Sequence, residues 1–243
     1  MRYLLLLWPP LLRRARSPCP PFLAQSSGNR WHIARRIHVT IPTLRHACRH
    51  MPETLAPTTV LPRARLRLEF VRPVHAPRIQ ALAGDPRLAR YTRLPHPYPG
   101  DGAIIFVRES MEGRITGREV VFAIMECGEL RGVCGVQEIN ANARTADLGY
   151  WVDPDHWGQG IATEAARAAC GFAFQHLGLQ LLTACHAVRN EASGRVMRKI
   201  GFRATHTRPD DRLGETLYYE LIPAQLHENQ ELVVVEIAPG EFR

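Results

Sequence analysis

Between residues 148 and 165 the chain reads LGYWVDPDHWGQGIATEA, an apolar strand pattern followed by a turn, a glycine-spaced loop and an alanine-rich helix. Gly158 and Gly160 allow the backbone to bend and approach a ligand closely, so that several N–H groups can point into one concavity. The helix is expected to begin near Thr163, where its first N–H groups lack intrahelical partners and favour anions. This stretch therefore predicts a site for the phosphates of a cofactor.

Two common nucleotide-binding loops do not fit these residues. A P-loop requires Gly-Lys-Ser/Thr, and the only lysine in the sequence is Lys199. A dinucleotide fingerprint requires a small residue where Thr163 stands and an acidic residue about 20 positions further on, where the chain has Gln180. On the two glycines alone, a plain strand-to-helix turn that binds nothing remains an alternative.

Four separated motifs, in this order, resemble the GNAT superfamily of acetyl-CoA-dependent N-acetyltransferases, and within it the RimJ/RimL group. They are HPYP at 96–99, LGYWVDP at 148–154, HWGQGIATEA at 156–165, and NEAS at 190–193 followed by KIGF at 199–202. Many GNAT members carry Arg or Gln where Trp157 stands, and this substitution is usual in the RimJ/RimL group. The resemblance covers residues 65 to about 222 and implies an α/β fold. Its central sheet would be mixed, mostly antiparallel and twisted, splayed between its fourth and fifth strands and flanked by helices.

Hydrophobic periodicity predicts the elements of this domain. Alternation indicates a half-exposed first strand at 65–72, and residues 73–93 are expected to form one or two helices with Asp85 as a cap. Further helices are expected at 101–112, 163–177 and 190–200. Further strands are expected at 120–127, 132–139, 145–152, 179–188, 202–207 and 215–221. The alanines of the 163–177 helix are expected to let it pack close to the sheet.

The net charge of +8 is concentrated near the start of the chain. Residues 1–50 hold nine arginines and no Asp or Glu, whereas the remainder holds 22 basic and 23 acidic residues. We expect a basic arm (1–50) that is disordered or not native, a linker (51–64), the GNAT-like domain (65–222) and a C-terminal tail (223–243). The arm has three interpretations: a targeting peptide, a contact with ribosomal RNA or other nucleic acid through phosphates, or a stretch preceding a native start at Met51.

Cysteine spacing argues against a metal-binding or disulfide-rich protein, and hydropathy argues against a membrane protein. The six cysteines lack Cys-x-x-Cys spacing, so no metal site or disulfide framework is expected, and reduced, mostly buried thiols suit a reducing compartment. The apolar run from Tyr3 to Trp8 stops at two prolines, far short of the roughly 20 residues of a membrane span. We expect a cytoplasmic protein without membrane contact, and the sequence leaves its oligomeric state open.

The resemblance implies acetyl-CoA as the acyl donor. Backbone groups at the end of the fourth strand, especially around Val152, are implied to pair with the acyl and pantetheine portions, and the loop N–H groups to hold the pyrophosphate. The cofactor-binding residues so implied are Trp151, Val152, Asp153, Gly158, Gln159, Gly160, Ile161, Ala162, Thr163 and Asn190.

Proton transfer has fewer candidates. Ser193 matches the serine that RimL-like enzymes place to protonate the leaving thiolate, and Asp147 stands where the group usually has an acidic residue, which makes it a candidate base. Asn190 and Ser193 could equally be an ordinary N-cap and a first-turn residue. Other hydroxyls and bases stay open as alternatives: Tyr150, Tyr218, Tyr219, His96, Glu138, Asp210 and Asp211.

The expected function is acetyl transfer to a primary amine, directly within a ternary complex, with a protein N-terminal amine as the acceptor. An α-amine with a pKa near 8 needs about 1.4 kcal/mol to lose its proton at pH 7, against roughly 4.6 for a lysine near 10.4. A site without a convincing buried base therefore suits an α-amine. Two alternatives remain: a small-molecule amine acetyltransferase (for a polyamine, amino acid or antibiotic), and a non-catalytic acetyl-CoA-binding or ribosome-associated module.

Overall fold

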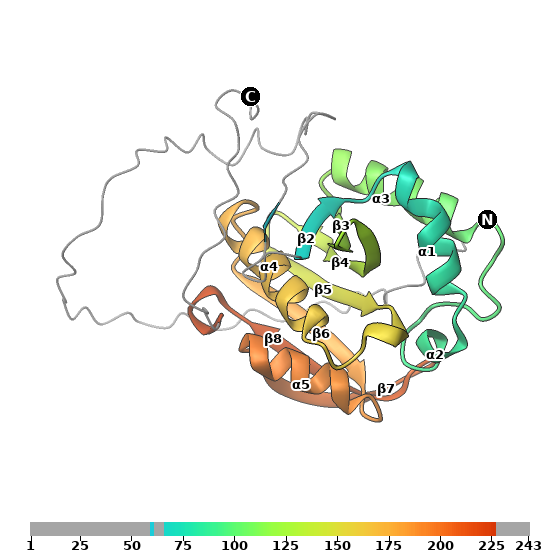
Figure 1. Ribbon diagram of the computed structural model, residues 1–243. Helices are drawn as coiled ribbons and strands as arrows, with labels where there is room; N and C mark the ends of the chain where they lie inside the picture. Colours follow the sequence, from blue (N-terminus) through green and yellow to red (C-terminus); the bar gives the residue numbers. More distant parts are fainter. Residues whose placement is uncertain (1–58, 61–65, 227–243) are drawn as a thin grey trace, which may run out of the picture.

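The computed structural model describes residues 59–60 and 66–226. Its centre is an eight-stranded sheet with the strand order β1-β2-β3-β4-β5-β6-β8-β7 (Figure 1). Neighbouring strands are antiparallel except β5 and β6, which are parallel, so the sheet is mixed and mostly antiparallel as predicted. The strands are β1 (Thr59–Val60), β2 (Leu66–Phe70), β3 (Val120–Glu126), β4 (Glu129–Asn140), β5 (Thr145–Val152), β6 (Leu181–Ala187), β7 (Arg203–Asp210) and β8 (Gly214–Leu221).

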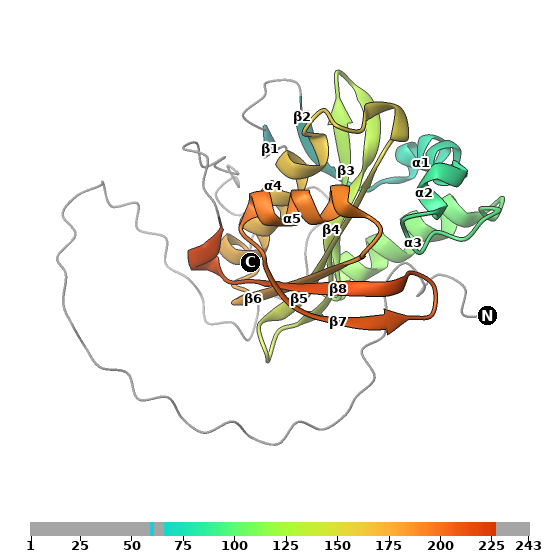
Figure 2. The same ribbon diagram turned by 90° about the horizontal axis from the view of Figure 1, so that it is seen from below.

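Helices pack on the two faces of this sheet. They are α1 (Ala76–Ala83), α2 (Pro86–Ala89), α3 (Gly102–Ile115), α4 (Ile161–Gln175) and α5 (Glu191–Ile200), with 3-10 turns η1 (Pro73–His75), η2 (Pro154–His156) and η3 (Pro223–Gln225). In Figure 2, α4 and α5 lie next to each other, away from α1, α2 and α3.

Alternation along β5 explains why both faces are covered. Leu148 and Val152 belong to the buried cluster that includes the α4 alanines, whereas Trp151 belongs to the cluster formed with α1 and α3. Successive side chains of a strand point to opposite faces, so β5 contributes to both cores. A strand buried on both faces in this way lies in the interior of the domain.

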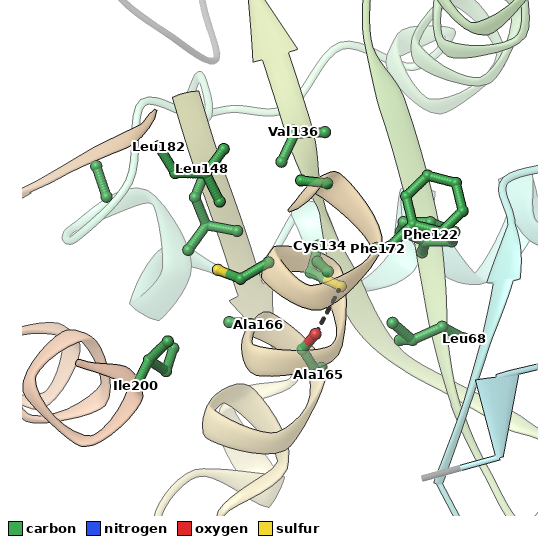
Figure 3. Close-up of a cluster of buried hydrophobic side chains, with 14 of the residues drawn as sticks. Leu68, Phe122, Cys134, Val136, Leu148, Ala165, Ala166, Phe172, Leu182 and Ile200 are labelled. Carbon is green, nitrogen blue, oxygen red and sulfur yellow. Dashed lines mark hydrogen bonds between the residues drawn. The ribbon is translucent and has the colours of Figure 1, made fainter. Parts of the chain in front are cut away.

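Helix α4 packs close to the sheet because its inner face consists of small side chains (Figure 3). Ala165 and Ala166 are fully buried, and the Cys134 thiol of β4 donates to the Ala165 carbonyl at 3.7 Å. Phe172, almost two helical turns after Ala165, packs edge-on against Phe122 of β3. The prediction that the alanines are packing residues is confirmed by this geometry, which fixes the direction of α4.

The predicted splay between the fourth and fifth strands lies between β5 and β6, because the additional strand β1 shifts the numbering by one. These two strands are paired only from Thr145 to Asp147, opposite Leu181 to Thr183. Beyond that point β5 stays paired with β4 as far as Val152, and β6 stays paired with β8 as far as Ala187. The facing edges of β5 and β6 therefore separate, leaving main-chain groups without a strand partner.

Several element boundaries differ from expectation, among them the end of β7, which continues to Asp210. Helix α4 begins at Ile161, not near Thr163, because Gly160 has φ of 85° and serves as its N-cap. Helix α3 continues to Ile115, and β4 begins three residues earlier than expected. The short strand β1, which pairs with β2, falls in the predicted linker, where two residues carry no periodic signal.

Several expectations concern residues outside the described part of the chain. The basic arm, Met51 and residues 227–243 of the C-terminal tail all lie there. Among the described residues the cysteines are free: Cys134 and Cys170 are buried, Cys185 is partly buried and Cys127 is exposed. In this same part of the chain, no helix has the length and apolar character needed to cross a membrane.

Candidate active site

A cleft of about 630 Å³ opens where β5 and β6 separate. Its lining includes the glycine loop, the first turns of α4 and α5, Tyr91 to Arg93 from the segment after α2, and Leu213 of the β7–β8 turn. Trp151 and Val152, both predicted to bind the cofactor, also line it. The splay thus brings the end of β5 into one cleft with the glycine loop.

The glycine loop has the backbone conformation that the sequence predicted. Gly158 has φ of 78° and Gly160 has φ of 85°, values that favour glycine because other residues would be strained there. Gly160 caps α4, and its carbonyl accepts from the Thr163 N–H at 3.0 Å. The amides of Ile161 and Ala162 come at the first two helical positions, where no helix carbonyl is available to them.

The residues that carry these amides line the cleft. Gly158, Gly160, Ile161, Ala162 and Thr163 line it, whereas Gln159 is exposed and lies outside the lining. Unpaired N–H groups and the positive end of a 15-residue helix are brought to one surface. Such a surface suits a phosphate group.

Asp153 has a structural position. Its side chain, 3% exposed, accepts from the Asp155 N–H at 3.1 Å and forms an ion pair with Arg78 at 3.0 Å. Its own N–H donates to the Arg131 carbonyl at 2.6 Å. Asp153 does not line the cleft, and these contacts fix the turn that precedes the glycine loop.

Trp157 connects the glycine loop to the end of β5. Its indole Nε1 donates to the Val152 carbonyl at 2.8 Å, and its ring packs edge-on against Tyr91 with centroids 6.1 Å apart. The Val152 carbonyl is thereby occupied by the protein itself. The sequence identified Trp157 only as a subfamily marker, because a contact that reaches back five residues across a loop leaves no periodic signal.

Ser193 and Tyr150 form a hydroxyl pair inside the cleft. The two oxygens lie 2.9 Å apart, and the Tyr150 hydroxyl also donates to the Ser193 carbonyl at 3.3 Å. Asn190 caps α5 by accepting the Ser193 N–H at 3.2 Å, so its Oδ1 has the ordinary capping role and a ligand contact would come from Nδ2. Burial raises the pKa of Tyr150, which keeps the phenol neutral.

The two acidic candidates lie in different surroundings. Asp147 accepts a hydrogen bond from the Thr183 hydroxyl where β5 and β6 are still paired, and it does not line the cleft. Burial, reinforced by Glu138, raises its pKa. Asp210 pairs with Arg93 at 2.7 Å. Although burial opposes ionisation, Arg93 and two backbone N–H groups hold the pKa of Asp210 below its ordinary value. Asp210 is therefore a poor proton acceptor.

Two cations on α5 were missed by the sequence reasoning. Arg195 and Lys199 line the cleft on the side of the glycine loop. They stand four residues apart, which places both on one face of the helix. The i, i+4 spacing was a readable signal, but the direction of that face depends on how α5 packs against α4.

A family model described as an acetyltransferase (GNAT) domain matches residues 65–203, which is more than half of the chain. The chain belongs to the GNAT acetyltransferase family. The resemblance expected from the four motifs is thus confirmed, as is the mixed, mostly antiparallel sheet. The chain spans about half the length of the curated relatives it matches.

Curated GNAT relatives carry more than one kind of name. A ribosomal-protein-serine acetyltransferase of Escherichia coli K12 is 31% identical over 99 residues, 39% of this chain and 55% of that protein. A spermidine N(1)-acetyltransferase of the same organism is 35% identical over 80 residues, 32% of this chain and 43% of that protein. The matches therefore support the RimJ/RimL-like group without deciding the acceptor.

Solved GNAT structures share the fold. A RimL ribosomal L7/L12 alpha-N-protein acetyltransferase in complex with coenzyme A has a TM-score of 0.59 at 21% identity, covering 65% of this chain and 94% of that chain. A spermidine N-acetyltransferase from Vibrio cholerae, in complex with CoA and spermine, has a TM-score of 0.60 at 19% identity, covering 67% and 98%. At these identities the likeness concerns the fold alone.

Proposed function

We propose that this protein is an acetyl-CoA-dependent N-acetyltransferase that transfers the acetyl group directly to a primary amine, with a protein N-terminal α-amine as acceptor. The observation that carries the proposal is one cleft that holds both the α4 glycine loop and the Ser193–Tyr150 hydroxyl pair, at the point where β5 and β6 separate. Family membership supports the same chemistry.

The donor side of the cleft has the groups that acetyl-CoA requires. The amides of Ile161 and Ala162 would hold the pyrophosphate at the start of α4, and Arg195 and Lys199 would neutralise further phosphate charge. The unpaired edge of β5 beyond Asp147 offers main-chain groups to the pantetheine amides and the thioester carbonyl. Solved neighbours in complex with CoA or acetyl-CoA lend support to this donor.

Ser193 is assigned the role of protonating the leaving thiolate. As the amine attacks, a C–N bond forms, the C–S bond breaks, the amine loses a proton and the sulfur gains one. Ser193 supplies a proton to the sulfur and regains one from the amine, so the hydroxyl acts as a shuttle and no net charge remains on it. Tyr150 stays neutral and holds the Ser193 oxygen in place.

The acceptor proposal rests on the positions of the two acidic candidates for the base. Asp147 is withdrawn from the lining and Asp210 is committed to Arg93. An α-amine is already partly neutral near pH 7, whereas a polyamine or lysine amine needs a stronger base. The relative named spermidine N(1)-acetyltransferase favours a small polyamine as the second candidate. Ribosome contact through the basic arm stays a prediction, since the arm lies outside the described residues.

The experiment is a thiol-release assay with the purified full chain and acetyl-CoA. Peptides with free N-termini, the same peptides blocked at the N-terminus but carrying a lysine, and spermidine are supplied in turn. Release with free N-termini, and at least tenfold less with the other acceptors, is expected. Faster release with spermidine would show that the acceptor is a polyamine and not a protein N-terminus. Acetyl-CoA binding without thiol release on any amine would show that the protein is a non-catalytic binding module.

A further inference from the structure

Arginines join two segments at the cleft, the segment after α2 and the β7–β8 turn. Arg93 forms its ion pair with Asp210, and Arg212 Nη1 donates to the Arg93 carbonyl at 2.8 Å. Arg189, which follows β6 and lines the cleft, donates from Nη2 to the Arg90 carbonyl at 3.2 Å. The segment after α2 is thereby fixed against the β7–β8 turn.

The guanidinium groups of Arg189 and Arg212, together with that of Arg90, form what we call the arginine rim. Of the three, Arg189 lines the cleft, and Arg90 and Arg212 lie beside it. All three side chains belong to exposed residues. Arg189 and Arg212 donate to carbonyl oxygens, and Arg90 lies over the Tyr91 ring at 5.5 Å. None of the three has a carboxylate within 4.0 Å among the described residues.

Other arginines near the cleft differ in this respect. Arg78 pairs with Asp153, and Arg87 pairs with both Asp85 and Asp155. The turn that carries Arg212 also carries one exposed carboxylate, Asp211, and the cleft-lining Glu191 pairs with Arg195 at 3.7 Å. The three rim arginines therefore outnumber the carboxylates beside them. A carbonyl oxygen satisfies a hydrogen-bond donor but does not neutralise it, and the rim charge is left for a ligand.

From this charge pattern we infer that the acceptor is a primary amine accompanied by a carboxylate, which Arg189 and the arginine rim bind. The inference deepens the proposed acetyl transfer and rests on it. A guanidinium pairs with a carboxylate through two parallel hydrogen bonds and a full charge, whereas a polycation would meet repulsion at the same rim. The carboxylate could belong to an Asp or Glu side chain near a protein N-terminus, or to a free amino acid.

Matched acceptors test the charge preference. Three peptides share an N-terminal serine and differ only at the second residue, which is Asp, Asn or Lys; free serine is a fourth acceptor. At low salt the Asp peptide is expected to give a kcat/KM at least tenfold above that of the Lys peptide, with the Asn peptide between them. High salt should shrink this advantage. The ratio of kcat/KM for free serine to kcat/KM for the Asp peptide distinguishes the two carboxylate sources. A ratio above one indicates a free amino acid, and a ratio below one indicates an acidic side chain near a protein N-terminus.

Arg189→Gln removes the charge and keeps an amide donor for the carbonyls. It is expected to raise KM for the Asp peptide about tenfold and to raise KM for the Asn peptide much less, so that the ratio of the two kcat/KM values falls. The matched control is Arg108→Gln, because Arg108 is an exposed residue of α3 outside the cleft lining, and its loss changes net charge equally. The control is expected to match the wild type.

The possible failures are distinguishable. No thiol release from any amine contradicts the proposed acetyl transfer itself. Release that is equal for the three peptides, or fastest for the Lys peptide, overturns only the rim inference. The salt series on the wild-type protein decides this even if Arg189→Gln weakens the contact between the loops.

Discussion

At the scale of single residues, the account depends on a pair of hydroxyls that are 43 positions apart in the chain. Tyr150 stands on β5 and Ser193 on the first turn of α5, and their oxygens meet at 2.9 Å in the cleft. Burial keeps the phenol protonated, so it orders the serine without taking part as an ion. Ser193 was predictable by resemblance; its partner was only one hydroxyl among several.

Substitution at this pair should affect turnover and leave donor binding intact. Ser193→Ala is expected to lower kcat about 100-fold, because the shuttle for the thiolate proton is removed. Tyr150→Phe should lower kcat about tenfold through the loss of one ordering hydrogen bond. Steady-state kinetics and calorimetric titration with acetyl-CoA measure both quantities. A Ser193→Ala protein with wild-type kcat would remove Ser193 from the chemistry.

A second residue-scale prediction concerns Glu119, which precedes β3. Burial, aided by Glu109 and Glu138 against the opposing effect of Arg118, raises its pKa to about 7. The folded protein then holds this proton up to a higher pH than the unfolded chain, so its stabilising effect is present below the ordinary carboxyl pKa and is lost as pH rises towards 7. Glu119→Gln should therefore stabilise the protein by roughly 1–3 kcal/mol more at pH 8.5 than at pH 5.

Urea unfolding at the two pH values measures this difference. The control is Glu112→Gln on α3, whose carboxylate is largely exposed. The control should give the same change in the free energy of unfolding at both pH values. An equal effect of Glu119→Gln at pH 5 and pH 8.5 would show that the buried carboxyl is not the source of pH dependence.

At the scale of elements, α4 combines two glycines with opposite expected effects. Gly160 is the N-cap in a left-handed conformation, whereas Gly171 lies inside the helix, where an added Cβ would point into open space. Gly160→Val should weaken acetyl-CoA binding at least tenfold, since a β-branched residue is strained there and displaces the first amides. Gly171→Ala should leave binding unchanged and stabilise the fold by about 0.5–1 kcal/mol.

Calorimetric titration and thermal unfolding of the two variants form one matched experiment. Equal acetyl-CoA affinity in both variants would mean that the α4 loop does not hold the donor.

Local hydrophobic periodicity predicts most of the helices and strands. The features that it does not predict depend on backbone conformation or on contacts between residues far apart in the sequence. Alternation predicts β5 from Thr145 to Val152, and the glycine spacing predicts the loop that follows it. The sequence predicts the start of α4 two residues late, at Thr163. The true N-cap, Gly160, has no side chain, so only its left-handed backbone conformation identifies it. The Arg93–Asp210 pair joins residues 117 positions apart, which neither periodicity nor motif can connect.

At the scale of the whole molecule, the donor should stabilise the fold by mass action. A ligand at 100 times its Kd adds about 2.7 kcal/mol to the free energy of unfolding, which corresponds to a Tm increase of roughly 5–10 °C for a domain of this size. Thermal unfolding with acetyl-CoA should show this increase. ATP and NADH should not, because their fingerprints are absent from the loop. An equal increase with either nucleotide would mean that the cleft recognises phosphate in general.

The central claim is that the cleft between β5 and β6 transfers acetyl groups from acetyl-CoA to amines. Its most direct test is thiol release with a free N-terminal peptide, measured in parallel for the wild type, Gly160→Val and Ser193→Ala. We predict turnover by the wild type, a loss in Gly160→Val that raising acetyl-CoA partly restores, and a loss in Ser193→Ala that it does not restore. Equal turnover by all three proteins, or none by the wild type with any amine, would contradict the account.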